Sequence, residues 1–257
     1  MTHQRTLTAA HWGVYEVEYD DAGKAVRLHP FSKDPDPSPI GLHVLSDEVT
    51  RLRVRRPAVR KSWLDQGPGA NPERRGQDPF VEVSWDEALD LVAGELARVK
   101  RTWSNRAIFG GSYGWSSAGR FHHAQSQVHR FLNSIGGYVR HQDSYSLGAA
   151  RVLMPHIVAP MDELMSMHTS WDVLAEHCKL FVTFGGVPHK NSQINAGGAT
   201  LHHVKRGLYG LREKGVRFVN VTPTADDLDT GGEVEWLAIR PNTDTALILA
   251  LCHTLLA

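Results

Sequence analysis

Lys179-Leu180-Phe181-Val182-Thr183-Phe184-Gly185-Gly186 is an apolar run of strand length that ends in two glycines. Similar runs occur at Val216–Val221, which Thr222-Pro223 ends, and at Glu233–Ile239. A helical segment separates the first two runs, and a further helix is expected to begin at Asp244. Strands separated by helices predict parallel βαβ units, so we expect an α/β fold with doubly wound, mostly parallel sheets.

The N-terminal half predicts a further set of strands and helices behind a small β-hairpin region. Residues 11–30 alternate as the strands of a hairpin do. Ser84-Trp85-Asp86-Glu87 is a capping box that begins a helix. A short strand at Arg106–Phe109 and a helix over residues 116–134 are expected next. We therefore expect three parts, namely an N-terminal β region at 1–46, a first α/β segment at 47–170 and a second one at 171–257.

The composition is that of a neutral globular chain. It has 257 residues, and its 28 Lys and Arg balance its 28 Asp and Glu, which argues against binding nucleic acid or a membrane surface through net charge. No apolar segment is long enough to span a bilayer, and the opening residues lack the apolar core of an export signal. The two cysteines, Cys178 and Cys252, make no disulfide framework. We expect a cytoplasmic protein, or a periplasmic one if an export signal precedes this sequence.

Four loops are candidates for a ligand site. Ligands in open α/β sheets bind beyond the carboxyl ends of the strands, where loops and helix N-termini converge. Glycines there let backbone amides approach a phosphate, and short polar side chains offer further contacts. The loops with such compositions are Gly110–Gly114, Gly185–Lys190, Thr222–Thr224 and Pro241–Asp244. Ordinary turns and helix caps have the same composition, so the pattern alone favours neither interpretation.

The first of these loops allows two interpretations. Residues 110–114 match G-x-S-x-G, which predicts a serine hydrolase with Ser112 as nucleophile and His253 as the only histidine after the candidate acids. Alternatively, Tyr113 and Trp115 form a polar lip that faces one pocket. Neither G-x-G-x-x-G nor a P-loop is present, and the histidine pairs lack the spacing of zinc motifs, so those sites are not predicted.

Many further short motifs occur together, in one order, from near residue 7 to the end of the chain. They are His11-Trp12-Gly13, Arg56–Lys61, Arg75–Asp78, Val83–Leu91, Gly110–Trp115, Gly136–Tyr138, Tyr145-Ser146, Gly148–Ala150, Met154–His156, Thr169–Trp171 and Asn242–Asp244. Taken together, they resemble the dimethyl sulfoxide reductase family of molybdopterin oxidoreductases. The branch they resemble includes trimethylamine N-oxide reductase and biotin sulfoxide reductase.

The resemblance implies a bis(molybdopterin guanine dinucleotide) molybdenum cofactor. In this branch the serine of a Tyr-Ser-Thr segment binds the metal, and the matching residue is Ser146 in Tyr145-Ser146-Leu147. An alkoxide oxygen is a hard ligand, which suits a high-valent metal. Other branches of the superfamily hold an iron–sulfur cluster with four N-terminal cysteines. No cysteine precedes Cys178, so no iron–sulfur cluster is expected.

The same resemblance implies roles for further residues. Tyr113 and Trp115 are implied to donate hydrogen bonds at the substrate oxygen, since phenol O–H and indole N–H are donors. Lys190 would suit the charge of the cofactor pyrophosphate. The residues implied to contact the cofactor are Trp115, Ser116, Ser117, Ala118, Gly119, His189, Lys190, Asn191, Thr222, Pro223, Asn242, Thr243 and Asp244, of which the last five match loops that hold a guanosine portion.

The implied reaction is oxygen-atom transfer, in which an S-oxide or N-oxide is reduced and two electrons and two protons release the oxygen as water. No motif identifies the electron donor. Family enzymes are several times longer, and the last helix ends in Leu255-Leu256-Ala257 without a cap, so we expect an N-terminal fragment that lacks a C-terminal part. The alternative is a non-catalytic fragment or subunit that needs a partner chain to complete the cofactor site.

Overall fold

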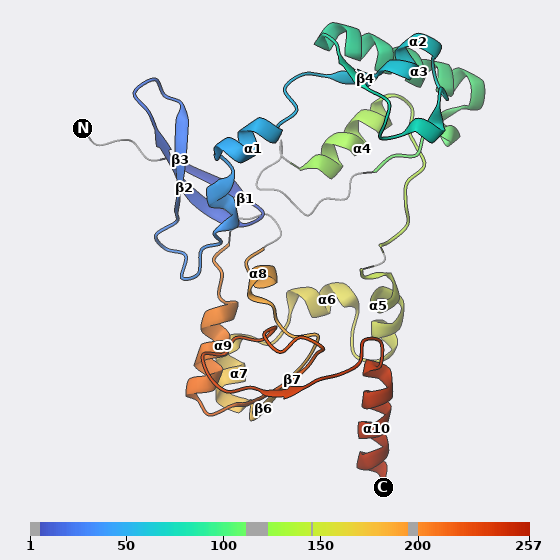
Figure 1. Cartoon of the computed structure of the whole chain (residues 1–257). Helices are drawn as coiled ribbons and strands as arrows, with labels where there is room; N and C mark the ends of the chain where they lie inside the picture. The colour runs from blue at the N-terminus through green and yellow to red at the C-terminus, as the bar shows by residue number, and fades with distance from the viewer. Residues whose placement is uncertain (1–5, 112–122, 145, 195–199) are drawn as a thin grey trace. The chain divides into compact units, whose positions relative to one another are not determined.

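The structure, a computed structural model, describes residues 6–111, 123–144, 146–194 and 200–257 (Figure 1). The chain divides into two compact units. The first unit holds the described parts of Met1–Leu45, Gly114–His123 and Asp143–Ala257, and the second holds those of Ser46–Tyr113 and Ala124–Gln142. The first unit thus joins the N-terminal β region to the last part of the chain. The predicted three-part division, with its limits at residues 46 and 170, stays a prediction.

The first unit begins with an antiparallel sheet of three strands, β1 (Thr6–Ala10), β2 (Gly13–Tyr19) and β3 (Ala25–Pro30), in that order. Strands β2 and β3 confirm the hairpin predicted over residues 11–30. Strand β1 was not predicted from the sequence, since Leu7 is its only large apolar residue and most of its residues are exposed.

The hydroxyl of Tyr15 holds this sheet against the loop that follows it. Tyr15 is 1% exposed, and its hydroxyl donates a hydrogen bond that is 3.0 Å long to the Ser38 carbonyl. Burial raises the pKa of this tyrosine. A Cβ at Gly41 would lie 2.4 Å from the Tyr15 oxygen, so only glycine allows the two segments to approach this closely.

The rest of the first unit is built on three parallel strands in the order β6-β7-β8. They are β6 (Leu180–Phe184), β7 (Arg217–Val221) and β8 (Glu235–Leu237). Helices α7 (Trp171–His177) and α9 (Val204–Glu213) pack on one face of this sheet, where Leu208, Leu211, Val216, Phe218 and Leu228 form the core. This arrangement confirms the predicted α/β fold with its N-terminal β region.

The opposite face of β6 is largely open among the described residues. Leu180, Val182 and Phe184 are 51%, 44% and 43% exposed. Helix α10 also buries none of its residues, although its sequence is apolar all round. The helices of the first unit other than α7 and α9 are η1 (Ile40–His43), α5 (Gly148–Leu153), η4 (Met154–His156), α6 (Met161–Ser166), α8 (His189–Ser192) and α10 (Asp244–Leu256).

The second unit is mostly helical and contains one antiparallel strand pair. The predicted capping box is confirmed, because Ser84 Oγ accepts a hydrogen bond from the Glu87 amide over 3.1 Å at the start of the long helix α3. The elements of this unit are α1 (Asp47–Leu52), β4 (Ala58–Arg60), α2 (Lys61–Gln66), η2 (Pro72–Arg74), β5 (Phe80–Glu82), α3 (Trp85–Trp103), η3 (Asn105–Ala107) and α4 (Ala124–Ser134).

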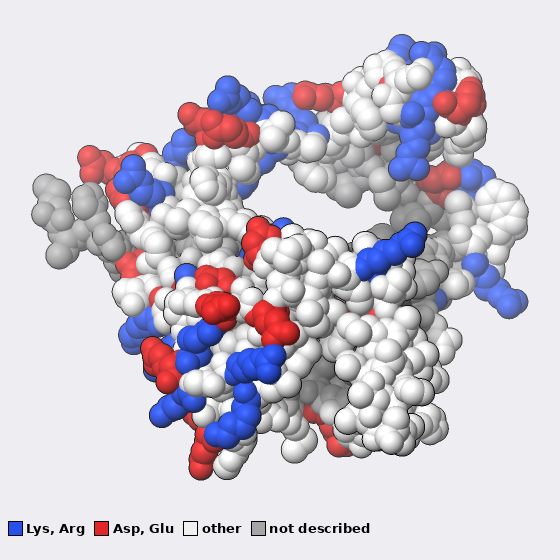
Figure 2. All heavy atoms as spheres, turned by 60° about the horizontal axis from the view of Figure 1, so that its bottom comes forward, with Lys and Arg blue, Asp and Glu red and all other residues white. Residues whose placement is uncertain are grey.

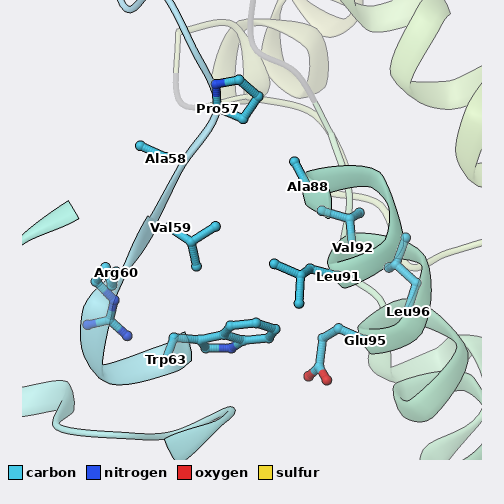
Figure 3. A pocket seen from close by; sticks show the side chains of 10 residues that line it. All are labelled: Pro57, Ala58, Val59, Arg60, Trp63, Ala88, Leu91, Val92, Glu95 and Leu96. Carbon is cyan, nitrogen blue, oxygen red and sulfur yellow. The ribbon is translucent and has the colours of Figure 1, made fainter. Parts of the chain in front are cut away.

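An apolar groove of about 580 Å³ separates the β4–α2 segment from α3 in this unit. Figure 3 shows Val59 and Trp63 on one side and Leu91 on the other, pointing toward the space between them. The predicted strand at Arg106–Phe109 is wrong. Its residues form the turn η3 and a single parallel bridge between Phe109 and Val139.

Charged side chains of both signs are interspersed on the face shown in Figure 2, in line with a formal net charge of zero. Within the described ranges, every helix is too short or too polar to cross a membrane.

Candidate functional site

The carboxyl ends of the three parallel strands lie at one edge of the sheet in the first unit. Phe184 of β6 is the register partner of Val221 of β7, which in turn pairs with Leu237 of β8. The loops that follow these strands therefore start side by side. Because ligands bind at such an edge in open α/β sheets, this edge is the candidate site.

The loop after β6 depends on two glycines in the left-handed region, Gly185 with φ of 84° and Gly186 with φ of 75°. The two glycines have different surroundings. A Cβ at Gly186 would lie 2.5 Å from the Asp227 Cβ, whereas a Cβ at Gly185 would have nothing within 4 Å. Gly186 therefore allows two loops to pack, and Gly185 leaves free space beside its Cα, while its amide donates to the Val221 carbonyl over 2.9 Å.

The loop after β7 is held by the hydroxyl of Thr222. Thr222 is 1% exposed, and its Oγ1 donates to Asp227 Oδ2 over 3.2 Å and accepts from the Thr224 amide over 3.3 Å. The Trp236 indole N–H donates to the Thr222 carbonyl over 2.7 Å. Pro223 is exposed beside it. Thr222 thus fixes the shape of the loop, while Pro223 and Thr224 face outward.

The loop after β8 leads into α10. Asn242 has φ of 66°, a left-handed conformation that asparagine tolerates better than most residues. The Thr243 hydroxyl donates to the Arg240 carbonyl over 2.6 Å, which closes the turn before Asp244 begins the helix. Asn242 is exposed, and Asp244 is partly exposed. This loop therefore offers an amide and a carboxylate on the segment that follows the third strand end.

Helix α8 carries three of the predicted site residues. Its first residue, His189, has Nε2 at 2.7 Å from Asp36 Oδ2. Lys190 and Asn191 are exposed, and no described residue forms a side-chain hydrogen bond or an ion pair with either of them. A cation and an amide are therefore free to meet a ligand at the end of β6.

A second carboxylate, Asp229, is held by hydrogen bonds in the loop after β7. The Gly231 amide donates to Asp229 Oδ1 over 3.0 Å and lowers the pKa of that carboxyl, and the Tyr209 hydroxyl, Lys205 and His189 lower it further against the effect of desolvation. The hydrogen bond from the Tyr209 hydroxyl to Asp229 raises the pKa of Tyr209 in turn. A backbone amide and a tyrosine hydroxyl thus both favour the ionised form of Asp229.

Ser146, the predicted metal ligand, lies in a turn just before α5 and is exposed. The turn is closed by the amides of Leu147 and Gly148, which both donate to the Ser144 carbonyl, the second over 2.7 Å. Arg151 lies 3.6 Å from the Asp143 carboxylate, at the start of the same turn. No described residue is hydrogen-bonded to Ser146 Oγ, so this oxygen is free to bind a ligand.

Several predicted site residues lie outside the described ranges. They are Ser112, Tyr113, Trp115, Ser116, Ser117, Ala118 and Gly119. Just before them, Gly110 has a packing role, since a Cβ there would lie 2.1 Å from Leu132 Cδ1. For the serine hydrolase, Asp244 and His253 stand nine residues apart on α10, or about 13 Å along its axis, so they cannot form the required hydrogen bond.

Two carboxylates of this region were not predicted from the sequence. Asp36 Oδ2 lies 2.7 Å from His189 Nε2, and Asp229 accepts hydrogen bonds from the Tyr209 hydroxyl and the Gly231 amide. The one signal for Asp36 was the alternation of aspartate and proline around it. Among the described residues, no three or more His, Cys, Asp or Glu side chains are grouped as a metal site would need.

Two family sequence models match the chain and together cover most of it. Residues 53–257 match the molybdopterin oxidoreductase family, and residues 8–47 match the molybdopterin oxidoreductase N-terminal domain.

Named relatives are similar over nearly the whole chain. The biotin sulfoxide reductase of Cereibacter sphaeroides is 43% identical over 224 residues, which are 87% of this chain and 30% of the relative. The dimethyl sulfoxide/trimethylamine N-oxide reductase of Rhodobacter capsulatus is 38% identical over 98% of this chain and 30% of the relative. The trimethylamine-N-oxide reductase of Haemophilus influenzae is 34% identical over 97% of this chain and 30% of the relative. The chain thus spans about 30% of the length of these relatives.

Proposed function

Because the chain belongs to the molybdopterin oxidoreductase family, in the branch of dimethyl sulfoxide, trimethylamine N-oxide and biotin sulfoxide reductases, we propose that it supplies the N-terminal part of a molybdenum-dependent S-oxide or N-oxide reductase. One observation carries the proposal beyond the similarity. Phe184, Val221 and Leu237 pair in register, so the segments that carry His189–Asn191, Thr222-Pro223 and Asn242–Asp244 each follow a strand that ends at the same edge of the sheet.

The chemistry of this edge fits a bis(molybdopterin guanine dinucleotide) cofactor. A pyrophosphate needs positive charge and room for close approach, which the exposed Lys190 and the uncrowded Gly185 offer. A guanine ring presents amino and imino donors together with a carbonyl acceptor, which Asp244 and Asn242 complement. We therefore assign phosphate contacts to the loop after β6 and guanosine contacts to Thr222-Pro223 and residues 242–244.

Ser146 is the proposed protein ligand of the molybdenum. Its Oγ is exposed and has no hydrogen-bond partner among the described residues, while bonds to the Ser144 carbonyl fix the backbone that carries it. When bound, the cofactor supplies a two-electron redox centre for oxygen-atom transfer. The chain's task is to hold that centre through a hard oxygen ligand and to keep it fixed.

Tyr113 and Trp115 are the proposed donors at the substrate oxygen, by family resemblance. Their O–H and N–H groups can stabilise negative charge on an oxygen that is leaving sulfur or nitrogen. Residues 116–119 are proposed to line the cofactor beside them. The substrate class is a small S-oxide or N-oxide, and the electron donor is a partner that no motif identifies.

The experiment that tests this function is a measurement of molybdenum content by mass spectrometry, on the chain purified from a host that makes the guanylated cofactor. Molybdenum in stoichiometric amount, with reduction of an S-oxide or N-oxide by the same preparation, is the expected result for a complete site. A chain that lacks molybdenum even when it is produced together with the remaining length of a family reductase would overturn the proposal.

The open apolar surface favours a second candidate, a non-catalytic subunit that binds a partner chain. The exposed faces of β6 and α10 are the supporting observation, since parallel sheets are usually covered on both faces. Light scattering decides this candidate. A monodisperse monomer that is stable at high concentration contradicts it, and a complex that contains a second polypeptide supports it.

A further inference from the structure

The segment Asp34-Pro35-Asp36-Pro37, here called the DPDP segment, contacts two histidines that lie far along the chain in the same unit. Asp34 Oδ2 lies 2.7 Å from Nδ1 of His202, and Asp34 Oδ1 accepts from the His202 amide over 3.1 Å. Both side chains are nearly fully buried, at 2% and 1% exposed. Asp34 therefore fixes the chain immediately before α9.

Asp36 makes the second contact. Its carboxylate accepts from His189 Nε2 over 2.7 Å, and its carbonyl accepts from the Gln193 side-chain amide over 3.0 Å. Gln193 is 3% exposed, and Asp36 keeps 15% of its side-chain exposure. One residue of the DPDP segment thus holds both ends of the short helix α8.

The DPDP segment is itself rigid. The Asp36 amide donates to Asp34 Oδ1 over 3.1 Å, which closes a turn between the two aspartates. Pro35 and Pro37 fix φ at their own positions and restrict the residue before each of them. The two carboxylates are therefore held at a fixed separation. Because each of them binds one histidine, they also fix His189 and His202, and Lys190 and Asn191 lie between these histidines in the sequence.

The contact with Asp36 also sets the state of the His189 ring. A carboxylate only accepts hydrogen bonds, so the bond assigns the proton to Nε2 and leaves Nδ1 on the other side of the imidazole. Asp36, which belongs to the N-terminal β region, therefore orients His189. The helix that carries His189, α8, has only four residues.

We infer that Asp36 is a positioning residue of the cofactor site: it orients His189 and, together with Asp34, holds Lys190 and Asn191 where an anionic group of the ligand meets the end of β6. This inference rests on the proposed function for the identity of the ligand. Its structural part, the control of His189 by Asp36, is independent of that identity.

The first test reads the His189 ring directly, without a ligand. Nitrogen-15 shifts of the imidazoles are measured in the full chain at about pH 8, where an ordinary histidine is neutral, and His189 is assigned by comparison with His189→Gln. The expected result is an Nε2-protonated ring in the wild type and in Asp36→Asn, which keeps an acceptor oxygen. A mixture of tautomers is expected in Asp36→Ala, and the matched control Asp21→Ala, an exposed aspartate of the same β region, should leave the shifts unchanged.

The second test measures the dissociation constant for guanosine diphosphate, used as a probe of the guanosine and phosphate portion, by calorimetry. Asp36→Ala is expected to weaken binding about tenfold, because the site loses the charged hydrogen bond that orients His189. Asp36→Asn should remain within about twofold of the wild type, since its amide oxygen restores the acceptor. Asp21→Ala should bind as the wild type does.

The outcomes separate the inference from the function it rests on. Unchanged His189 shifts in Asp36→Ala overturn the positioning role, whatever binds. If Asp36→Ala changes the tautomer of His189 but leaves the dissociation constant for guanosine diphosphate unchanged, the orientation of His189 does not affect the ligand. This result also overturns the inference. A wild-type chain that shows the expected ring but does not bind guanosine diphosphate overturns the part of the inference that concerns the ligand, whereas the molybdenum content decides the proposed function separately.

Discussion

Asp34 and His202 form a buried pair that joins the N-terminal β region to the residues just before helix α9. The approach is tight, since a Cβ at Gly13 would lie 2.8 Å from Cε1 of His202. The two regions, which are distant in the sequence, are therefore joined by a hydrogen-bonded contact that leaves no room for a larger residue on β2.

Removal of the Asp34 carboxylate should destabilise the chain strongly. Asp34→Ala leaves the His202 amide and ring nitrogen buried without a partner, and we expect a loss of about 2–4 kcal/mol in the free energy of unfolding. Asp34→Asn keeps one acceptor and should lose roughly half of that. Urea unfolding measures both. The exposed control Asp21→Ala should stay within about 0.5 kcal/mol, and a similarly small effect for Asp34→Ala would contradict the role of the pair.

The two glycines after β6 should respond differently to alanine. Both have positive φ, so each substitution introduces backbone strain of about 1 kcal/mol. Only the Cβ of Gly186→Ala meets a neighbour, at 2.6 Å from the Asp227 carbonyl oxygen, and this adds about 1–3 kcal/mol. Gly185→Ala is the matched control in the same unfolding assay. Equal losses for the two variants would show that the loops after β6 and β7 do not pack as described.

The Asp229 carboxyl should make stability depend on acid pH. Its pKa is lowered in the folded state, so its stabilising effect is full above the ordinary aspartate value of about 3.9 and disappears as the pH falls through the folded value. Tyr209→Phe removes one of the hydrogen bonds to this carboxylate and should move the pKa up toward its ordinary value. Carbon-13 titration of the Asp229 carboxyl measures the midpoint.

The control for this titration is Tyr19→Phe, which removes a tyrosine hydroxyl of the antiparallel sheet that is bonded to Thr6. The Asp229 midpoint should not change in that variant. If Tyr209→Phe also leaves the midpoint in place, the Tyr209 hydroxyl does not contribute, and the Gly231 amide with the charges of Lys205 and His189 accounts for the lowered pKa.

The parts of the fold that depend on local signals were predictable. The capping box at Ser84 and the apolar runs of the parallel strands are patterns within a few residues, and the structure confirms both. Burial was less predictable. The stripe on α3 that includes Leu89 and Trp103 has the period of a buried helix face, yet these residues are 60% and 55% exposed, because periodicity shows that a face is apolar and not what packs on it.

The candidate site was predictable only in part, for a similar reason. Glycines and polar residues after strands point to the carboxyl edge, and the parallel register brings those loops together. The contact of Asp36 with His189 joins residues that are 153 positions apart, and no local pattern encodes it. This contact forms because the DPDP segment, which its prolines make rigid, packs onto helix α8.

The assignment of Ser146 as the metal ligand makes the most specific prediction. Ser146→Ala removes the only atom of that side chain able to bind a metal, so we expect the molybdenum content and the rate of S-oxide or N-oxide reduction to fall at least about tenfold in the reductase that contains this chain. Ser144→Ala is the matched control, because Ser144 closes the turn with its carbonyl and not with its hydroxyl. It should keep both the metal and the activity.

A loss of metal could also follow from a damaged turn, and the control separates the two causes. Ser144→Ala also removes one hydroxyl oxygen from this turn. If damage to the turn were the cause, this variant would lose molybdenum as well. If Ser146 is the ligand, only Ser146→Ala loses it, while the free energy of unfolding of the two variants stays alike. Full molybdenum content and full activity in Ser146→Ala would mean that a different residue, or none from this chain, binds the metal.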